Sequence, residues 1–450
     1  MHRRHTNISR REFLKATGFG ALLAGAGSGP FFLFPERAQA AQKTLRILQW
    51  RHFVPSYDKW FDEVFAAGWG QKHDMKVIVE HVPLEKLREQ AASEVAMQKG
   101  HDLVMFPFPP AVYENEVIDH REIYRELRHQ WGETIEFAHK STFNPLTKKY
   151  FAFSDSYIPA PLNWSKDVWL EVGLPFGPVD YETLRSAGQA IRKAHNIPCG
   201  FGLAEEWNSN IALHALLWSF GGKIQDEHGQ VAINSKMTVE ALKYMKALYL
   251  DAGTPELLQW TRSSGPQAML EGRISCILHA ISISREAEEK PKSNTVLFSS
   301  PPRTHIDPLA PPHITQCYVI WNFSENKEEA KQFLVDLIGN FAQAFQASEF
   351  CNFPCFPKTV PDLLNQLSSD PKAVPHGKYE ILRDALQWTK PIGYPSYATA
   401  AVDEVFNSFV LPRMFAKVAK GQVTAEDAAQ AGEKEIAAIF SKQNQHRGGN

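Results

Sequence analysis

The sequence has few cysteines and lacks the short motifs that mark most catalytic, nucleotide and metal sites. Only five of its 450 residues are cysteine, no CxxC pair occurs, and no group of Cys and His has the spacing of a zinc site. Beyond residue 40 there is no HExxH, P-loop or nucleophile-elbow motif. These absences exclude the motif-defined metal and nucleotide sites, so we expect a protein with no cofactor and no catalytic activity.

A strong charge of either sign is also lacking. The formal net charge is −2, and residues 1–40 hold six of the 48 basic residues but two of the 50 acidic ones, which leaves −6 on the remainder. A nucleic-acid-binding protein needs a basic face, so we expect no nucleic-acid partner. Hydrophobic residues make up 44% and charged residues 22%, as in an ordinary globular protein, and the length allows about three domains or two unequal lobes.

The first 40 residues have the pattern of an export signal. Residues 9–15 read SRREFLK, a twin-arginine motif, and a mildly apolar run follows. Residues 38–40 read AQA, which fits the small-x-small cleavage rule. We therefore expect export by the twin-arginine machinery, cleavage after Ala40 and a periplasmic mature chain that begins at Ala41. An uncleaved membrane anchor is the alternative.

Disulfide bonds are not needed for folding in this interpretation, because twin-arginine export carries proteins that have already folded. An odd number of cysteines leaves at least one thiol unpaired. Cys351 and Cys355 are four residues apart and can pair only if the local geometry permits.

The pattern of hydrophobic residues after the signal predicts an α/β fold. Strands over residues 45–50, 75–81 and 102–105 alternate with helices over 57–69 and 84–99, which implies a parallel sheet with right-handed crossovers. A looser α/β pattern and a helical last part follow. The further strands are predicted over residues 199–203, 274–278 and 317–321, and the further helices over residues 181–195, 210–220, 237–249, 263–270, 328–339, 379–388, 397–420 and 425–442.

One stretch, residues 150–167, organises the rest of the chain. It reads YFAFSDSYIPAPLNWSKD, which predicts two extended runs with a break at Pro159 and Pro161, where a helix is excluded. We interpret it as a passage of the chain from one lobe to the other past the mouth of a cleft. The alternative is an ordinary loop within one domain. Residues 294–312 and 338–345 are the other candidate passages.

The order and spacing of these segments resemble the extracellular solute-binding proteins of carbohydrate ABC transporters, the maltose-binding-like group. Three segments are similar to family motifs: residues 102–106 to the "DIIF" strand, 267–278 to the "G-x-x-A-M" helix and strand, and 324–337 to the "NKELAKEFL" helix. Two segments depart from the family's usual sequence. Residues 164–167 read WSKD in place of YNKD, and residues 279–281 read HAI in place of GPW. The similarity covers about residues 44–442.

The resemblance implies an α/β, two-lobed periplasmic-binding-protein fold of type II, with a ligand cleft between the lobes and a helical C-terminal segment. It also implies a monomer that closes on a small-molecule solute and delivers it to ABC transporter permease subunits in the inner membrane. The N-terminal lobe would comprise residues 43–155 and about 305–340. The C-terminal lobe would comprise about residues 156–304 and 341–445.

Candidate ligand contacts combine flat aromatic rings, which suit the C–H faces of a sugar, with polar groups for its hydroxyl rim. Glu206 and Trp207 offer both side by side, and Trp50, Arg51 and His52 offer the same combination at a strand end. The other candidates lie at strand ends, in the passage or before a late helix, namely Phe106, Phe108, Ser154, Asp155, His279, Tyr394 and Tyr397. The alternatives are core packing for the aromatic residues, a turn cap for Asp155 and a surface charge for Arg51.

We therefore expect a periplasmic binding protein for a carbohydrate or a similar polyol. The rival from another class is an exported enzyme, either a cofactor-bearing oxidoreductase or a glycosidase. Glu205 and Glu206 are adjacent, so they give no evidence of a glycosidase pair on the two sides of a bond. A second rival is the same fold with a polyamine, an organic acid or a phosphorylated polyol as its ligand.

Overall fold

A computed structural model describes residues 42–289 and 295–448 of the chain. Residues from Lys43 onward form one unit. The predicted signal segment and its cleavage site lie outside the described residues. Across the two described ranges, no helix is long and apolar enough to span a membrane.

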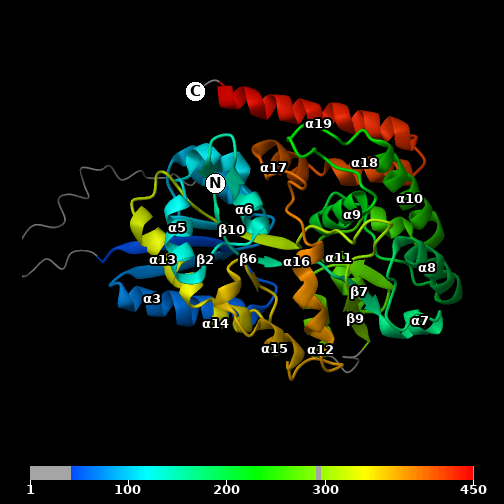
Figure 1. Cartoon of the computed structure of the whole chain (residues 1–450), viewed down its shortest axis with the longest axis horizontal. Coiled ribbons are helices and arrows are strands. Elements are labelled where there is room, and N and C mark those ends of the chain that lie inside the picture. The colour runs from blue at the N-terminus through cyan, green and yellow to red at the C-terminus, as the bar shows by residue number, and fades with distance from the viewer. Residues whose placement is uncertain (1–41, 290–294, 449–450) are drawn as a thin grey trace, which may run out of the picture. The chain divides into compact units, whose positions relative to one another are not determined.

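The larger of the two main sheets has six strands in the order β11–β6–β10–β3–β1–β2 (Figure 1). The strands are β1 (Thr44–Trp50), β2 (Lys76–Val82), β3 (Leu103–Phe106), β6 (Phe153–Ile158), β10 (Ile314–Ile320) and β11 (Phe353–Pro354). β1, β2 and β3 are parallel, which confirms the predicted βαβαβ order. β10 runs antiparallel between β3 and β6. β3, β6 and β10 are buried along their whole length, as strands covered on both faces are.

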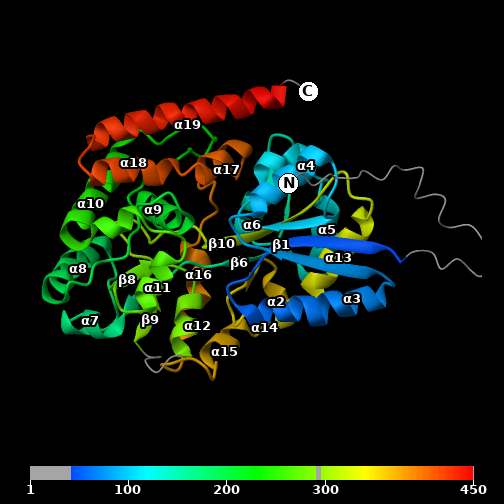
Figure 2. The same cartoon turned by 180° about the vertical axis from the view of Figure 1, so that it is seen from behind.

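Helices from the first part of the chain and from after β10 surround this sheet (Figures 1 and 2). They are α2 (Pro55–Trp60), η1 (Phe61–Ala66), α3 (Ala67–Lys72), α4 (Leu87–Met97), η2 (Ala111–Glu116), α5 (Arg121–Trp131), α6 (Glu136–Thr142), α13 (Lys327–Gly339) and α14 (Phe341–Ala347). α2, the π-helical η1 and α3 follow one another without a break, where one helix over residues 57–69 is predicted. This helix starts at Pro55, whose missing N–H costs nothing in a first turn.

A short hairpin, β4 (Phe143–Asn144) and β5 (Lys149–Tyr150), precedes β6.

The smaller sheet has three antiparallel strands, β8–β7–β9, and the chain reaches it through the predicted passage. β7 (Leu162–Ser165) pairs with β8 (Cys276–Leu278) and β9 (Val296–Ser299). Since β6 belongs to the large sheet and β7 to the small one, the chain crosses between them at residues 159–161. It returns between β9 and β10. The exact lobe boundaries stay a prediction.

Helices around the small sheet include the C-terminal part of the chain. They are α7 (Lys166–Glu171), α8 (Tyr181–His195), α9 (Trp207–Ser219), α10 (Lys236–Ala252), η3 (Pro255–Leu258), α11 (Ser264–Leu270) and α12 (Ser282–Glu288), then α18 (Val410–Ala419) and α19 (Ala425–Gly448). α18 packs on α9, α10 and α19. The link from β11 holds η4 (Pro357–Thr359), α15 (Leu363–Ser368), η5 (Lys378–Asp384) and α16 (Ala385–Trp388). A continuous hydrophobic core runs from Leu45 in β1 to Ile436 in α19.

Two predicted elements, the strand over residues 199–203 and the single helix over residues 397–420, are wrong. Residues 199–203 form no strand: Cys199 and Gly200 make single backbone hydrogen bonds to Ala252 and Cys276, and the segment stays irregular. The predicted helix over residues 379–388 is present as the 3-10 helix η5 followed directly by α16, which ends at Trp388.

The predicted helix over residues 397–420 is two helices, α17 (Ala400–Asn407) and α18. The break lies at Phe409, which has a left-handed backbone with φ of 55°. Pro412 explains it, because a proline removes a backbone donor and its ring would clash with the carbonyl four residues earlier in a continuous helix. Proline is tolerated here because the new helix has only just begun.

Candidate ligand-binding cleft

A cavity of about 1460 Å³ is lined by residues from the sides of both sheets. On the side of the large sheet, Phe53 follows β1 and Phe108 follows β3, at the carboxyl ends of parallel strands where α/β sheets present ligand groups. On the other side, Trp207 begins α9 and His279 follows β8. The further lining residues include Glu85, Arg88, Glu205, Glu206, Asn208, Ile211, Trp260, Arg262, Arg285, Glu286, Glu289, His313, Glu349 and Phe409.

Glu206 and Trp207 form one wall of the cavity because of the way α9 begins. Glu206 is the N-cap residue, and its carboxylate accepts hydrogen bonds from the backbone N–H groups of Asn208, at 2.8 Å, and Ser209. The helix therefore starts at Trp207, whose partly buried ring packs edge-on against Phe108 with centroids 5.3 Å apart. Burial raises the pKa of Glu206 to about 7, against the effect of its hydrogen bonds. A carboxyl group that titrates near neutral pH thus lies beside two aromatic rings.

A second aromatic group in the lining consists of Phe53, His279 and His313. The two imidazole centroids are 4.2 Å apart, and the Phe53 ring lies 5.4 Å from that of His313. The Arg262 guanidinium lies over the Phe53 ring, with Cζ 5.5 Å from its centroid, and Arg262 Nη1 is 3.3 Å from Glu85 Oε1. The cavity therefore has aromatic faces next to polar groups at two separate places.

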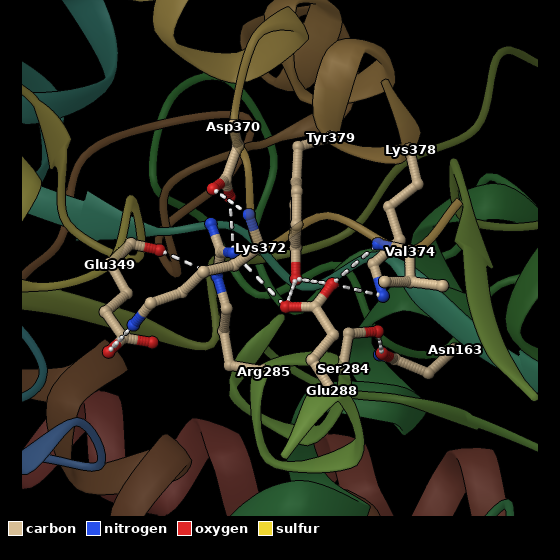
Figure 3. A network of polar contacts seen from close by, with 10 residues as sticks. All are labelled: Asn163, Ser284, Arg285, Glu288, Glu349, Asp370, Lys372, Val374, Lys378 and Tyr379. Carbon is tan, nitrogen blue, oxygen red and sulfur yellow. Dashed lines mark hydrogen bonds and ion pairs between the residues drawn. The ribbon is translucent and has the colours of Figure 1, made fainter. Parts of the chain in front are cut away.

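Arg285 lines the cavity from α12 and is held by a buried polar network (Figure 3). Its Nε donates to the Glu349 carbonyl at 3.0 Å, and Nη1 lies 2.5 Å from Asp370 Oδ2 and 3.3 Å from Glu288 Oε2. Its Cζ lies 3.8 Å over the Tyr379 ring. Two carboxylates, of which Glu288 also pairs with Lys378 Nζ at 2.7 Å, and an aromatic face thus stabilise the guanidinium and fix its orientation.

Four of the predicted ligand residues line the cavity, namely Phe108, Glu206, Trp207 and His279. Five others are buried outside the lining, namely Trp50, His52, Phe106, Ser154 and Asp155. Trp50 Nε1 donates to the Met105 sulfur at 3.0 Å, and His52 Nε2 lies 3.0 Å from Asn352 Oδ1. These two hydrogen bonds lie in the protein interior beside the large sheet, outside the cavity lining.

The last three predicted residues also lie outside the lining. Arg51 is exposed. Tyr394 and Tyr397 are partly buried, with ring centroids 5.4 Å from Trp218 and 5.8 Å from His139 respectively. Ligand contact by these three residues and by the five buried ones stays a prediction.

Sequence reasoning missed several lining residues. Phe53 could have been predicted from its place after β1, because Arg51 and His52, which directly precede it, were predicted for that reason. Trp260, Arg262 and Arg285 come from segments with no strand-end signal. His313 lies in the return passage, where the sequence shows only a proline-rich stretch. No local pattern distinguishes these residues from ordinary surface or core positions.

The remaining candidate chemistry concerns metals and thiols. Within residues 42–289 and 295–448, no group of three or more His, Cys, Asp and Glu is arranged to hold a metal ion. All five cysteines are buried free thiols, so Cys351 and Cys355 form no disulfide here. Burial raises the pKa of the Cys351 thiol to about 12, which makes it a poor nucleophile.

Comparison with known proteins identifies the family. The family model described as "Bacterial extracellular solute-binding protein" matches residues 55–344, well over half of the chain. The chain belongs to this family. Comparison with curated protein sequences gives no match.

Solved structures of solute-binding proteins share the fold. A sugar transporter from Arthrobacter chlorophenolicus A6 with bound laminaribiose is 14% identical, with a TM-score of 0.73, and the match covers 88% of this chain and 99% of that chain. The maltose-bound MalE3 of T. maritima is 19% identical, with a TM-score of 0.72 and the same coverage. A solute-binding protein from Agrobacterium radiobacter K84 in complex with ribitol is 17% identical, with a TM-score of 0.68, again over 88% and 99%. The predicted two-lobed periplasmic-binding-protein fold is confirmed.

Proposed function

We propose that this protein captures a carbohydrate or polyol in the cavity by hinge closure and delivers it to the permease subunits of an ABC importer. The observation that carries the proposal is the wall formed by Phe108, Glu206 and Trp207. It sets aromatic faces against a carboxyl group, which is the combination that a sugar needs for its C–H faces and its hydroxyls.

The size of the cavity supports a solute at least as large as a monosaccharide. Its volume of about 1460 Å³ exceeds the roughly 300–1,000 Å³ of common small-molecule sites. The structures named above hold laminaribiose, maltose and ribitol, all of which are uncharged polyhydroxy compounds. We infer that the solute here belongs to the same chemical class.

We also propose that the mature protein works in the periplasm as a monomer without catalytic activity. The extracellular family supports export, and the SRREFLK motif at residues 9–15 supports the twin-arginine route. The alternative oxidoreductase needs a cofactor, for which the sequence beyond residue 40 gives no motif. The family model that matches the chain is described as solute-binding, which favours capture of a solute over its hydrolysis.

A thermal-shift screen of the mature chain tests the function. A solute that binds only the folded state raises the melting temperature by mass action, by an amount equivalent to about 2.7 kcal/mol at a hundredfold excess over Kd. The panel contains ribitol, mannitol, glucose, maltose, laminaribiose and maltotriose, with spermidine, citrate and sorbitol 6-phosphate as competitors of other classes. We expect shifts from one or more of the neutral compounds. A shift from spermidine, citrate or the phosphate alone would overturn the proposal.

A further inference from the structure

His279 and His313 come together from distant parts of the fold to form a pair of imidazoles in the cavity wall. His279 follows β8 of the small sheet, and His313 precedes β10 of the large sheet. Their ring centroids are 4.2 Å apart, and the two residues are only 4% exposed. Both side chains line the cavity.

Each ring leaves one nitrogen for the cavity. His279 Nδ1 lies 3.4 Å from the Ala280 carbonyl oxygen, so its Nε2 is the nitrogen left without a partner among the described residues. His313 makes no side-chain hydrogen bond within the described part of the chain, and its Nδ1 is enclosed by protein atoms. Its Nε2 is therefore the nitrogen that can meet a solute. Buried imidazoles normally find a partner, so two unpaired Nε2 atoms in one cavity wall point to a ligand.

The surroundings favour one tautomer of each ring. A carbonyl oxygen can only accept, so the proton of His279 lies on Nδ1 and its Nε2 is an acceptor. His313 Nδ1 has no hydrogen-bond partner of either kind among the described residues. An enclosed N–H without an acceptor is rarer than an enclosed lone pair without a donor, so we assign the proton of His313 to Nε2, which is then a donor. Burial lowers the pKa of His279 to about 4 and that of His313 well below its usual value, which keeps both rings neutral at pH 7.

We propose that His279 and His313 form a donor–acceptor subsite that selects hydroxyl groups of the solute. A hydroxyl can accept from His313 Nε2–H and donate to His279 Nε2 at the same time. A carboxylate or phosphate oxygen only accepts, so it would face the lone pair of His279. An ammonium group only donates, so it would face the N–H of His313. The subsite deepens the proposed function, on which it rests, because it favours neutral polyhydroxy solutes over acids and amines.

Nitrogen-15 NMR of the histidine-labelled protein without any solute tests the tautomers directly. Resonances are assigned with the H279F and H313F variants, which keep ring size and remove the nitrogens. We expect the Nδ1–H form for His279 and the Nε2–H form for His313. The same tautomer on both rings, or a charged ring at pH 7, would overturn the subsite whatever the solute turns out to be.

Calorimetric titration with maltose, laminaribiose, ribitol, mannitol and glucose tests the role in binding. For each compound that binds the wild-type protein, H279F and H313F should each weaken binding roughly three- to tenfold, the effect of one neutral hydrogen bond. H313Q, which restores an N–H near the Nε2 position, should recover part of the affinity. H214F is the matched control, since His214 is buried in α9 but does not line the cavity.

The outcomes separate the two proposals. Unchanged affinity in both phenylalanine variants would overturn the subsite and leave the proposed function standing. If the wild-type chain binds neither these five compounds nor maltotriose, the proposed function fails, and the NMR result then decides the subsite on its own.

Discussion

Phe108 and Trp207 meet edge-on across the cavity wall, with ring centroids 5.3 Å apart, although 99 positions separate them in the sequence. Phe108 follows β3 of the large sheet, and Trp207 begins α9 beside the small sheet. The contact joins the two halves of the chain at the place where we expect the solute to bind.

Replacement of Trp207 by alanine should weaken solute binding more than it weakens the fold. The ring is only partly buried, so its loss should cost less than the roughly 3–5 kcal/mol of a core tryptophan. As a central aromatic anchor it should contribute about 2 kcal/mol to binding, or roughly a thirtyfold change in Kd. Calorimetry with a sugar that binds the wild type and a urea melt measure the two effects.

W169A is the control for this prediction. Trp169 is fully buried in α7 and donates to the Ser275 carbonyl at 2.8 Å, away from the cavity. The W169A variant should lose stability and keep the wild-type affinity for the sugar. The reverse pattern in the two variants would show that Trp207 is a core residue rather than a binding platform.

Saturating solute should bring the two lobes closer together. The cavity is lined from both sides, so a closed form makes contacts with the solute that an open form does not, and the solute shifts the population towards it. Small-angle X-ray scattering should therefore show a smaller radius of gyration with maltose, laminaribiose or ribitol, whichever binds. An unchanged radius with bound solute would count against hinge closure.

The D370N variant should unfold more easily because Asp370 neutralises a buried arginine (Figure 3). The Asp370 and Arg285 side chains are each 5% exposed, and loss of one charge leaves the other poorly compensated. We expect a cost of about 3 kcal/mol in the free energy of unfolding. K372A is the control, because Lys372 is 63% exposed in its pair with Glu349 and should contribute less than about 1 kcal/mol. Equal urea midpoints for the two variants would refute the prediction.

Asp155 should make the fold less stable as the pH rises. The residue is fully buried; Oδ1 accepts from Ser156 Oγ at 2.9 Å, while Oδ2 has no partner among the described residues. Burial raises the pKa of Asp155 to about 7. The unfolded chain therefore loses this proton first, and stability falls between about pH 4 and pH 7 by an amount on the order of 2–4 kcal/mol.

The D155N variant removes this titration. It should resemble the wild type in stability near pH 4 and exceed it at pH 8, as measured by urea melts at both values. If the wild type is at least as stable as D155N at pH 8, the carboxylate has a stabilising partner and the prediction is wrong.

Export should depend on the arginine pair of residues 9–15. Replacement of Arg10 and Arg11 by lysine should retain the precursor in the cytoplasm, since the twin-arginine machinery reads this pair. N-terminal sequencing of the exported wild-type protein should read Ala-Gln-Lys from Ala41. Normal export of the double variant would refute the twin-arginine assignment.

The sequence by itself determined the parallel βαβαβ start and the break between β6 and β7, whereas only the structure showed that this break joins two sheets. Alternating runs of hydrophobic residues report strands and helices directly. Pro159 and Pro161 restrict the backbone locally, so the break between β6 and β7 needs no tertiary information. Phe108, Glu206, Trp207 and His279 were also predictable as lining residues, because strand ends and polar neighbours mark them in the sequence.

Only the tertiary structure decided which residues meet in the cavity. At the end of β1, Trp50 turns inward to the Met105 sulfur while Phe53, three residues later, lines the cavity, and no local pattern distinguishes these two orientations. His279 and His313 are 34 positions apart, and their contact depends on how the chain returns from one sheet to the other. The physical reason is that periodicity records whether a side chain is buried, whereas its partners are set by packing between segments that are distant in the sequence.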